Sequence, residues 1–173
     1  MNHLASMQRE FSEEMGTTRK VLDRVPVDKL AWKPHERSMS LGQLALHIAS
    51  VPGAIARITK PDIFDVSRNS FNPPSPKTMD EVYDALKQSI RDVEQTFNQA
   101  TEETAQADWH LMFGERELSS TPRASVWRSL MLNHCYHHRG QLVVYLRLLD
   151  IPVPSIYGPS ADQNPFPDLQ GDR

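Results

Sequence analysis

Three histidines are the residues best suited to chemistry in this sequence: His47, and the pair His134 and His138. The pair has the spacing His-x-x-x-His, and residues four apart on an α-helix lie on one face, about 5–6 Å apart at Cβ. Two imidazoles at that separation can bind one divalent metal ion, and a third ligand can come from another helix. The spacing therefore predicts a metal site with three protein ligands and at least one open coordination position.

His137 offers an alternative partner for His134. The arginines of this stretch mark its expected polar side: Arg128, Arg139 and Arg147. If Arg139 faces solvent, the direction of His137 around the helix points inward at least as deeply as that of His138. A pair of His134 with His137, three residues apart, also shares one helical face. Periodicity does not choose between the two pairs.

The residues around the histidines exclude two common kinds of metal centre. A zinc protease with a His-Glu-x-x-His motif needs Glu directly after the first histidine as general base, and here that position is Cys135. Di-iron helical proteins need Glu-x-x-His motifs and bridging glutamates, whereas residues 125–149 contain no Asp or Glu. A carboxylate-poor site of three histidines remains as the prediction.

Other reactive side chains near the histidines have simpler interpretations. His47 alone fits a core histidine bonded to a backbone carbonyl, but the later pair favours ligation, because two buried imidazoles need partners. Cys135 is turned about 100° away from its neighbour His134, so we expect a buried structural thiol. His35 and Glu36 precede the helix of His47 and could approach the site, although a solvated loop is favoured.

Four stretches with the apolar spacing of amphipathic helices must position these residues: about residues 2–24, 40–59, 78–97 and 121–150. Ser40 and Gln43 form a capping box at the start of the second stretch, whose proline, Pro52, predicts a kink. Thr121 is expected as the N-cap of the fourth, with Pro122 at its first helical position.

Apolar residues define the buried side of two of these helices. In the second stretch they are Leu44, Ile48, Val51, Ile55 and Ile58. In the fourth they are Trp127, Leu130, Leu142 and Tyr145, in series with His134. Proline-rich connections cover residues 61–76 and 151–167, and residues 108–118 predict a short hairpin with Gly114 at the turn. Four amphipathic helices with little strand predict an all-α helical bundle.

The composition predicts a soluble, cytoplasmic protein of one domain. The chain has 173 residues and a formal net charge of −3, so it can form a real core and lacks the basic face that nucleic-acid binding needs. No apolar run approaches the roughly 20 residues that cross a membrane, and residues 1–14 have no signal-peptide stretch. The single cysteine fits a reducing compartment. We therefore expect neither nucleic acid nor a membrane as partner.

The sequence resembles the DinB-like superfamily, also called damage-inducible DinB proteins. The resemblance covers about residues 1–165 and rests on three motifs in matching order: WKP at 32–34 with SMSLGQLALHIA at 38–49, HCYHHRGQ at 134–141, and PSIYGPSAD at 154–162. The first motif resembles the stretch that ends in the family's first metal histidine, here His47. The second resembles its His-x-x-x-His-Arg-x-Gln signature, which places the other ligands at His134 and His138 rather than at His137.

This resemblance implies an up-down-down-up four-helix bundle over residues 1–165, followed by a flexible tail at 166–173. It also implies a homodimer that binds a divalent metal such as zinc or nickel. Some relatives are thiol-dependent transferases that act with bacillithiol or mycothiol, so a metal-dependent S-transferase with a low-molecular-weight thiol as cosubstrate is the first functional hypothesis. The alternatives are a metal-dependent hydrolase and a non-catalytic stress protein that binds metal or a small ligand. The substrate and any catalytic side chain are not defined by the sequence.

Overall fold

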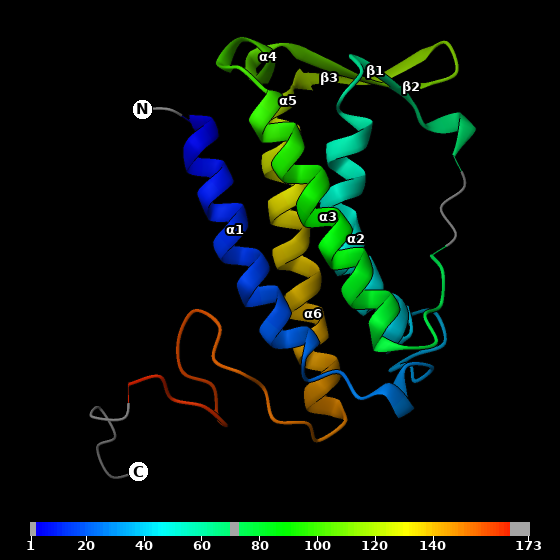
Figure 1. Ribbon diagram of the computed structural model, residues 1–173. Coiled ribbons are helices and arrows are strands. Elements are labelled where there is room, and N and C mark those ends of the chain that lie inside the picture. Colours follow the sequence, from blue (N-terminus) through cyan, green and yellow to red (C-terminus); the bar gives the residue numbers. More distant parts are fainter. Residues whose placement is uncertain (1–2, 70–72, 167–173) are drawn as a thin grey trace.

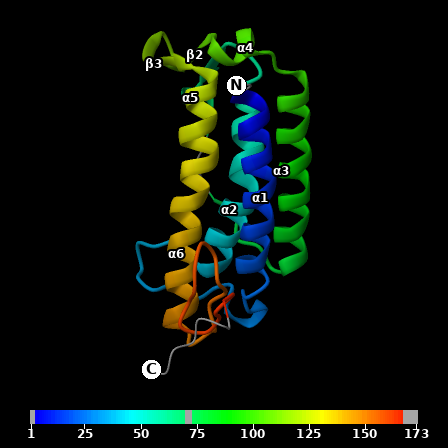
Figure 2. The same ribbon diagram turned by 90° about the vertical axis from the view of Figure 1, so that its left-hand side faces the viewer.

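The computed structural model describes residues 3–69 and 73–166, which form a mostly helical protein with a small sheet. The long helical elements are, in chain order, α1 (His3–Leu22), α2 (Leu41–Ile58), α3 (Met79–Gln99), and a final helix made of α5 (Arg123–Val126), the π-helical segment η3 (Trp127–Asn133) and α6 (His134–Leu148). In Figure 1 these helices lie side by side, with α1 and α6 running in one direction and α2 and α3 in the other. Figure 2 shows the same packing from another side.

The predicted start of α2 is confirmed by its capping residues. The Ser40 side chain accepts a hydrogen bond from the backbone N–H of Gln43 at 3.1 Å, and the Gln43 side chain accepts one from the backbone N–H of Ser40 at 3.0 Å. This capping box satisfies two amides that the first turn of α2 leaves free. The helix then continues through Pro52 to its end. Residue 2, the expected start of the first helix, lies outside the described residues.

A small sheet covers one end of the long helices and corrects the expectation of an all-α protein (Figure 1). Its strands are β1 (Ile63–Asp65), β2 (Asp108–Phe113) and β3 (Arg116–Pro122), in the order β1-β2-β3. The β2–β3 hairpin was predicted, and Gly114 at its turn has a φ of +60°, which glycine adopts without strain. β1 lies in the proline-rich connection and pairs with β2 in parallel. Short helical turns complete the described chain: η1 (Val27–Lys29), η2 (Val66–Arg68) and α4 (Glu102–Gln106).

The sheet also displaces the expected start of the final helix. Thr121 and Pro122 pair with Trp109 and Asp108 as the last residues of β3, and α5 begins only at Arg123. No side-chain hydrogen bond caps this helix at Pro122. The predicted N-cap at Thr121 is therefore wrong, because pairing with β2 holds this segment as a strand.

The buried face of α2 differs from the expected stripe because α3 approaches the helix very closely. Leu44 and Ile48 are buried as expected, whereas the later members of the stripe are only half-buried. Gly53 is buried instead, and its N–H donates to the Ser89 hydroxyl at 2.6 Å. A Cβ atom at Gly53 would lie 2.6 Å from the Ser89 Cα, so only glycine permits this contact between the two helices.

The π-helical segment changes which residues of the final helix face the core. Leu130 was expected to be buried, but it is 38% exposed, while Met131 and Leu132 are both fully buried. Hydrogen bonds from residue i to i+5 place more residues in each turn than an α-helix does. The apolar residues in this segment therefore depart from α-helical spacing.

Residues 151–166 follow the final helix without regular structure, and near the other end of the helices they lie beside α1 and α6 (Figures 1 and 2). Asp162 holds this segment, because its carboxylate accepts from the backbone N–H of Val153 at 2.8 Å and pairs with Arg147. Of the tail expected to be flexible, residues 167–173 lie outside the described residues. The length and composition of α2 would allow it to cross a membrane, but half of it is buried inside the protein, as in the core helix of a globular protein.

Candidate metal centre

His47, His134 and His138 come together between α2 and α6. His134 is the first residue of α6 and His138 lies one turn later, so both point towards His47 on α2. The Nε2 atoms of His47 and His134 are 3.1 Å apart, and one ring nitrogen of each of the three residues lies within 4.8 Å of the others. All three side chains are half-buried, which leaves the group partly open to solvent.

The arrangement fits a divalent metal ion. Two nitrogens bound at 2.0–2.1 Å to one tetrahedral ion lie about 3.3 Å apart, close to the 3.1 Å between His47 and His134. Within residues 3–69 and 73–166, this is the one group of three or more potential ligands that comes together, and it contains no carboxylate or thiol. Its donor set of imidazole nitrogens suits zinc, nickel, copper and iron better than magnesium or calcium.

The environment keeps the three imidazoles neutral. Burial and, to a smaller extent, the charges that His138 and His134 would carry together lower the pKa of His47 to about 4. Burial also lowers the pKa of His134, with His138 and His137 adding to the effect. For His138, burial lowers the pKa and a hydrogen bond to Gln141 opposes that change. Neutral rings have a free lone pair, which a metal ligand requires.

His137 lies outside this group. Its side chain is exposed, and its Nε2 accepts a hydrogen bond from the Gln141 amide at 3.1 Å. The expectation that it points inward is wrong, because Arg139, the reference for the polar side of the helix, is only 2% exposed. Arg139 is buried against α1, so it does not mark the solvent side.

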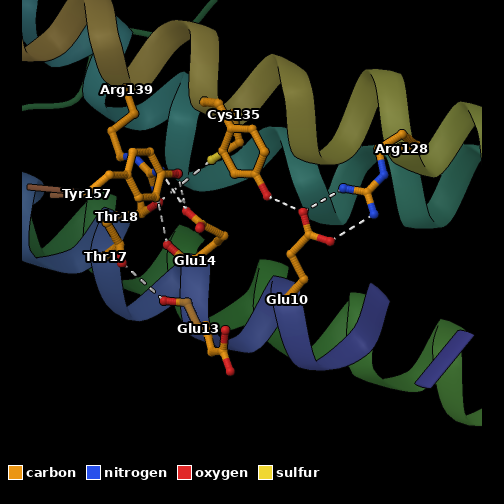
Figure 3. A network of polar contacts seen from close by, with 10 residues as sticks. Glu10, Glu13, Glu14, Thr17, Thr18, Arg128, Cys135, Arg139 and Tyr157 are labelled. Atoms are coloured by element: carbon orange, nitrogen blue, oxygen red, sulfur yellow. Dashed lines mark hydrogen bonds and ion pairs between the residues drawn. The ribbon is translucent and has the colours of Figure 1, made fainter. Parts of the chain in front are cut away.

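A polar network explains why this arginine is buried (Figure 3). The Arg139 guanidinium donates to the Glu14 carboxylate at 2.6 Å, to the Thr18 hydroxyl at 3.1 Å and to the hydroxyl of Tyr157. The Tyr157 hydroxyl in turn donates to the Glu14 carboxylate at 2.8 Å. The network therefore joins α1, α6 and the segment after α6 around one buried ion pair.

A second contact between α1 and the final helix is centred on Glu10, about one turn before Glu14 on α1 (Figure 3). The Glu10 carboxylate accepts from both terminal nitrogens of Arg128, at 2.5 and 2.8 Å, and from the Tyr136 hydroxyl at 2.7 Å. These contacts hold one face of the final helix against α1. The opposite face, with His134 and His138, is thereby turned towards α2.

The remaining candidate residues take no part in the histidine group. Cys135 is buried, its sulfur lies 3.7 Å from the Thr18 hydroxyl, and burial raises the pKa of its thiol. This agrees with the expected structural thiol. His35 and Glu36 are exposed in the loop before α2, where His35 Nδ1 accepts from the backbone N–H of Arg37 at 3.2 Å. The expectation of a solvated loop is confirmed.

The fold and the site define a class of protein: mostly helical, with three histidines from two helices that converge. Residues 1–166 match the model of the DinB family, and the chain belongs to that family. The sequence is 26% identical over 157 residues to the uncharacterized protein YrdA of Bacillus subtilis (strain 168), covering 90% of this chain and 88% of that protein.

Two solved structures share the fold. A DinB-like protein from Bacillus cereus ATCC 10987 superposes with a TM-score of 0.69 at 22% identity, covering 87% of this chain and 95% of that one. The DinB-like protein YjoA from Bacillus subtilis superposes with a TM-score of 0.66 at 20% identity, covering 92% and 99% of the two chains. At these identities the likeness establishes the fold alone.

Proposed function

We propose that this protein binds a divalent metal ion, zinc or nickel, through His47, His134 and His138, and acts as a metal-dependent S-transferase. The observation that carries the proposal is the convergence of three histidines, with one ring nitrogen of each lying within 4.8 Å of the others. Their half-burial leaves one side for a further ligand. When bound, the ion supplies an electrostatic field that lowers the pKa of a thiol or water at its open position.

The protein's own side chains favour a thiol that arrives as a cosubstrate. Cys135 faces α1 and has a raised pKa, so it does not supply a nucleophile to the histidine group. In the proposed transfer, the thiol loses its proton to solvent, its sulfur bonds to the electrophilic carbon of the second substrate, and the leaving group departs with the electrons of the broken bond. The chain contributes ligation and orientation.

The architecture proposed with this function is an up-down-down-up four-helix bundle in a cytoplasmic homodimer. The opposite directions of α1 and α6 relative to α2 and α3 support the bundle (Figure 1). The dimer and the location rest on the resemblance and the composition described above.

Metal analysis of single-histidine variants tests the site. We expect about one divalent ion per chain in the wild-type protein after loading and dialysis, and loss of that ion in His134→Ala and His138→Ala. His110→Ala is the control, because His110 lies in β2 and pairs with Glu117 across the hairpin. Full metal occupancy in both site variants, by elemental analysis, would contradict the assignment.

A panel of electrophiles, assayed with and without low-molecular-weight thiols, tests the reaction. Turnover that requires both thiol and metal supports the transferase. Cleavage of esters or amides without thiol would instead identify a hydrolase. Absence of turnover across the panel, with metal fully bound, would identify a non-catalytic metal protein.

A further inference from the structure

Gln141 links the two neighbouring histidines His138 and His137 through both ends of its side-chain amide. Its Oε1 lies 2.7 Å from His138 Nδ1, and its Nε2 lies 3.1 Å from His137 Nε2. All three residues belong to α6, with Gln141 three residues after His138 and four after His137, so they share one region of the helix surface.

The chemistry of the amide determines the protonation of His138. An amide oxygen only accepts hydrogen bonds, so the Nδ1 atom of His138 must carry the proton in this contact. In a neutral imidazole the other nitrogen, Nε2, then has the lone pair. The contact therefore selects which nitrogen of His138 is available as a ligand.

His137 receives the other end of the amide. The Gln141 Nε2 can only donate, so His137 Nε2 accepts from it, with the NH2 end at His137 and the oxygen end at His138. If His138 Nε2 served as a metal ligand, its Nδ1 would carry the proton, and only the oxygen end of the amide could face it. The NH2 end would then face His137, as observed.

We propose that Gln141 is a positioning residue of the histidine site, and that His137 orients it. Gln141 holds His138 as the Nδ1–H tautomer and fixes the plane of its ring, so that Nε2 faces His47 and His134. This inference rests on the proposed metal binding, and it assigns to Gln141 the hydrogen bond that metal-ligating histidines usually donate from their second nitrogen. It also gives the exposed His137 a role that does not involve ligation.

Metal affinity in Gln141 variants tests the proposal. Gln141→Leu removes the acceptor and keeps the approximate size of the side chain, and we expect it to raise the dissociation constant by about 10–100-fold. Gln141→Glu keeps an oxygen acceptor and should bind metal at least as tightly as Gln141→Leu, recovering most of the wild-type affinity. Gln88→Leu, an exposed glutamine of α3, is the matched control and should keep the wild-type constant. Chelator competition with cobalt(II) or zinc measures all four proteins, and the cobalt absorption spectrum reports the ligand geometry.

Nitrogen NMR of the metal-free wild-type protein provides a second readout, independent of any variant. We expect His138 as the Nδ1–H tautomer in the wild type and a mixture of tautomers in Gln141→Leu. An Nε2–H tautomer in the wild type, or an unchanged dissociation constant and cobalt spectrum in Gln141→Leu, would overturn the inference while leaving the proposed function intact. Failure of the wild type to bind metal would overturn the proposed function, and the tautomer would still test the Gln141 contact.

Discussion

The half-burial of three adjacent imidazoles makes each of them a poor base. Solvent that would stabilise a charged ring is partly excluded, and a charge on any one ring raises the free energy of a charge on the next. The effect is largest for His47, where the pKa falls to about 4. A cation with ligating geometry can replace the proton, because it interacts with three lone pairs at once.

The first prediction at this scale concerns the pH dependence of the metal-free protein. The pKa of His47 is about 4 in the folded protein and 6.5 ordinarily, so between these values the unfolded chain binds more protons. Protonation of His47 should therefore leave the free energy of unfolding unchanged above pH 6.5. Below that pH it should lower the free energy of unfolding progressively as the pH falls towards 4. Urea unfolding from pH 7.5 to pH 4.5 in the presence of a chelator measures the effect.

His47→Gln is the matched variant for this measurement, because it removes the titrating group and leaves the carboxylates unchanged. As the pH is lowered through that range, the free energy of unfolding of the wild type should fall relative to that of His47→Gln. A difference that is constant with pH would show that His47 is not kept neutral by the fold.

The shared helical face of His134 and His138 was predictable because their spacing is local, although only the family resemblance chose His138 over His137. The burial of Arg139 was not predictable. His134 and His138 share a helical face wherever that helix forms. Arg139 is buried because Glu14, 125 residues earlier in the chain, lies opposite it. No local pattern encodes that partner. Because Arg139 was expected on the polar side of the helix, His137 was wrongly expected to point inward.

The close contact between α2 and α3 depends on the absence of a side chain at one residue, Gly53. The Gly53 N–H already lies 2.6 Å from the Ser89 hydroxyl, and an added Cβ would meet the Ser89 backbone at the same distance. Since both helices are anchored along their lengths by buried apolar residues, neither can move away locally without opening the core.

The second prediction follows from this contact. Gly53→Ala should lower the free energy of unfolding by about 1–3 kcal/mol, because the helices must separate or shift to accept the methyl group. Gly16→Ala is the control: Gly16 lies in α1 with open space around its Cβ position, so alanine should stabilise by about 0.5–1 kcal/mol. Urea midpoints at constant pH compare the two variants, and equal changes in both would contradict the close-packing argument.

Strand pairing explains why the sequence predicted the hairpin but not the whole sheet. The β2–β3 hairpin has a local turn at Gly114, which the sequence shows. β1 pairs with β2 across the whole of α3, and such a parallel partner has no local signature. The same pairing converts Thr121 from a predicted helix cap into a strand residue.

At the scale of the whole molecule, the histidine group joins two helices that are distant in the sequence. His47 belongs to α2, and His134 and His138 belong to α6. His134 lies 87 residues after His47 in the sequence. A metal ion bound by all three would connect the first half of the chain to the second. The unfolded chain does not bring these residues together, so binding favours the folded state.

The third prediction is that metal stabilises the entire fold. Zinc at about 100 times its dissociation constant should raise the free energy of unfolding by about 2.7 kcal/mol, and removal by a chelator should reverse the change. Thermal unfolding of the wild type and of His138→Ala, each with zinc and with chelator, measures this contribution. The variant should show almost no shift on adding zinc; an equal shift in both proteins would place the ion elsewhere.

The π-helical segment η3 has a consequence for how this chain tolerates insertions and deletions. Deleting one residue between Leu130 and Asn133 and restoring α-helical bonding would keep the parts before and after η3 in nearly the same phase, because i to i+5 bonding holds more residues in each turn. Arg128 would still face Glu10, and His134 and His138 would still lie beside His47. A one-residue deletion is therefore expected to be tolerated better in η3 than in α6, where it would rotate the flanking parts by about 100°.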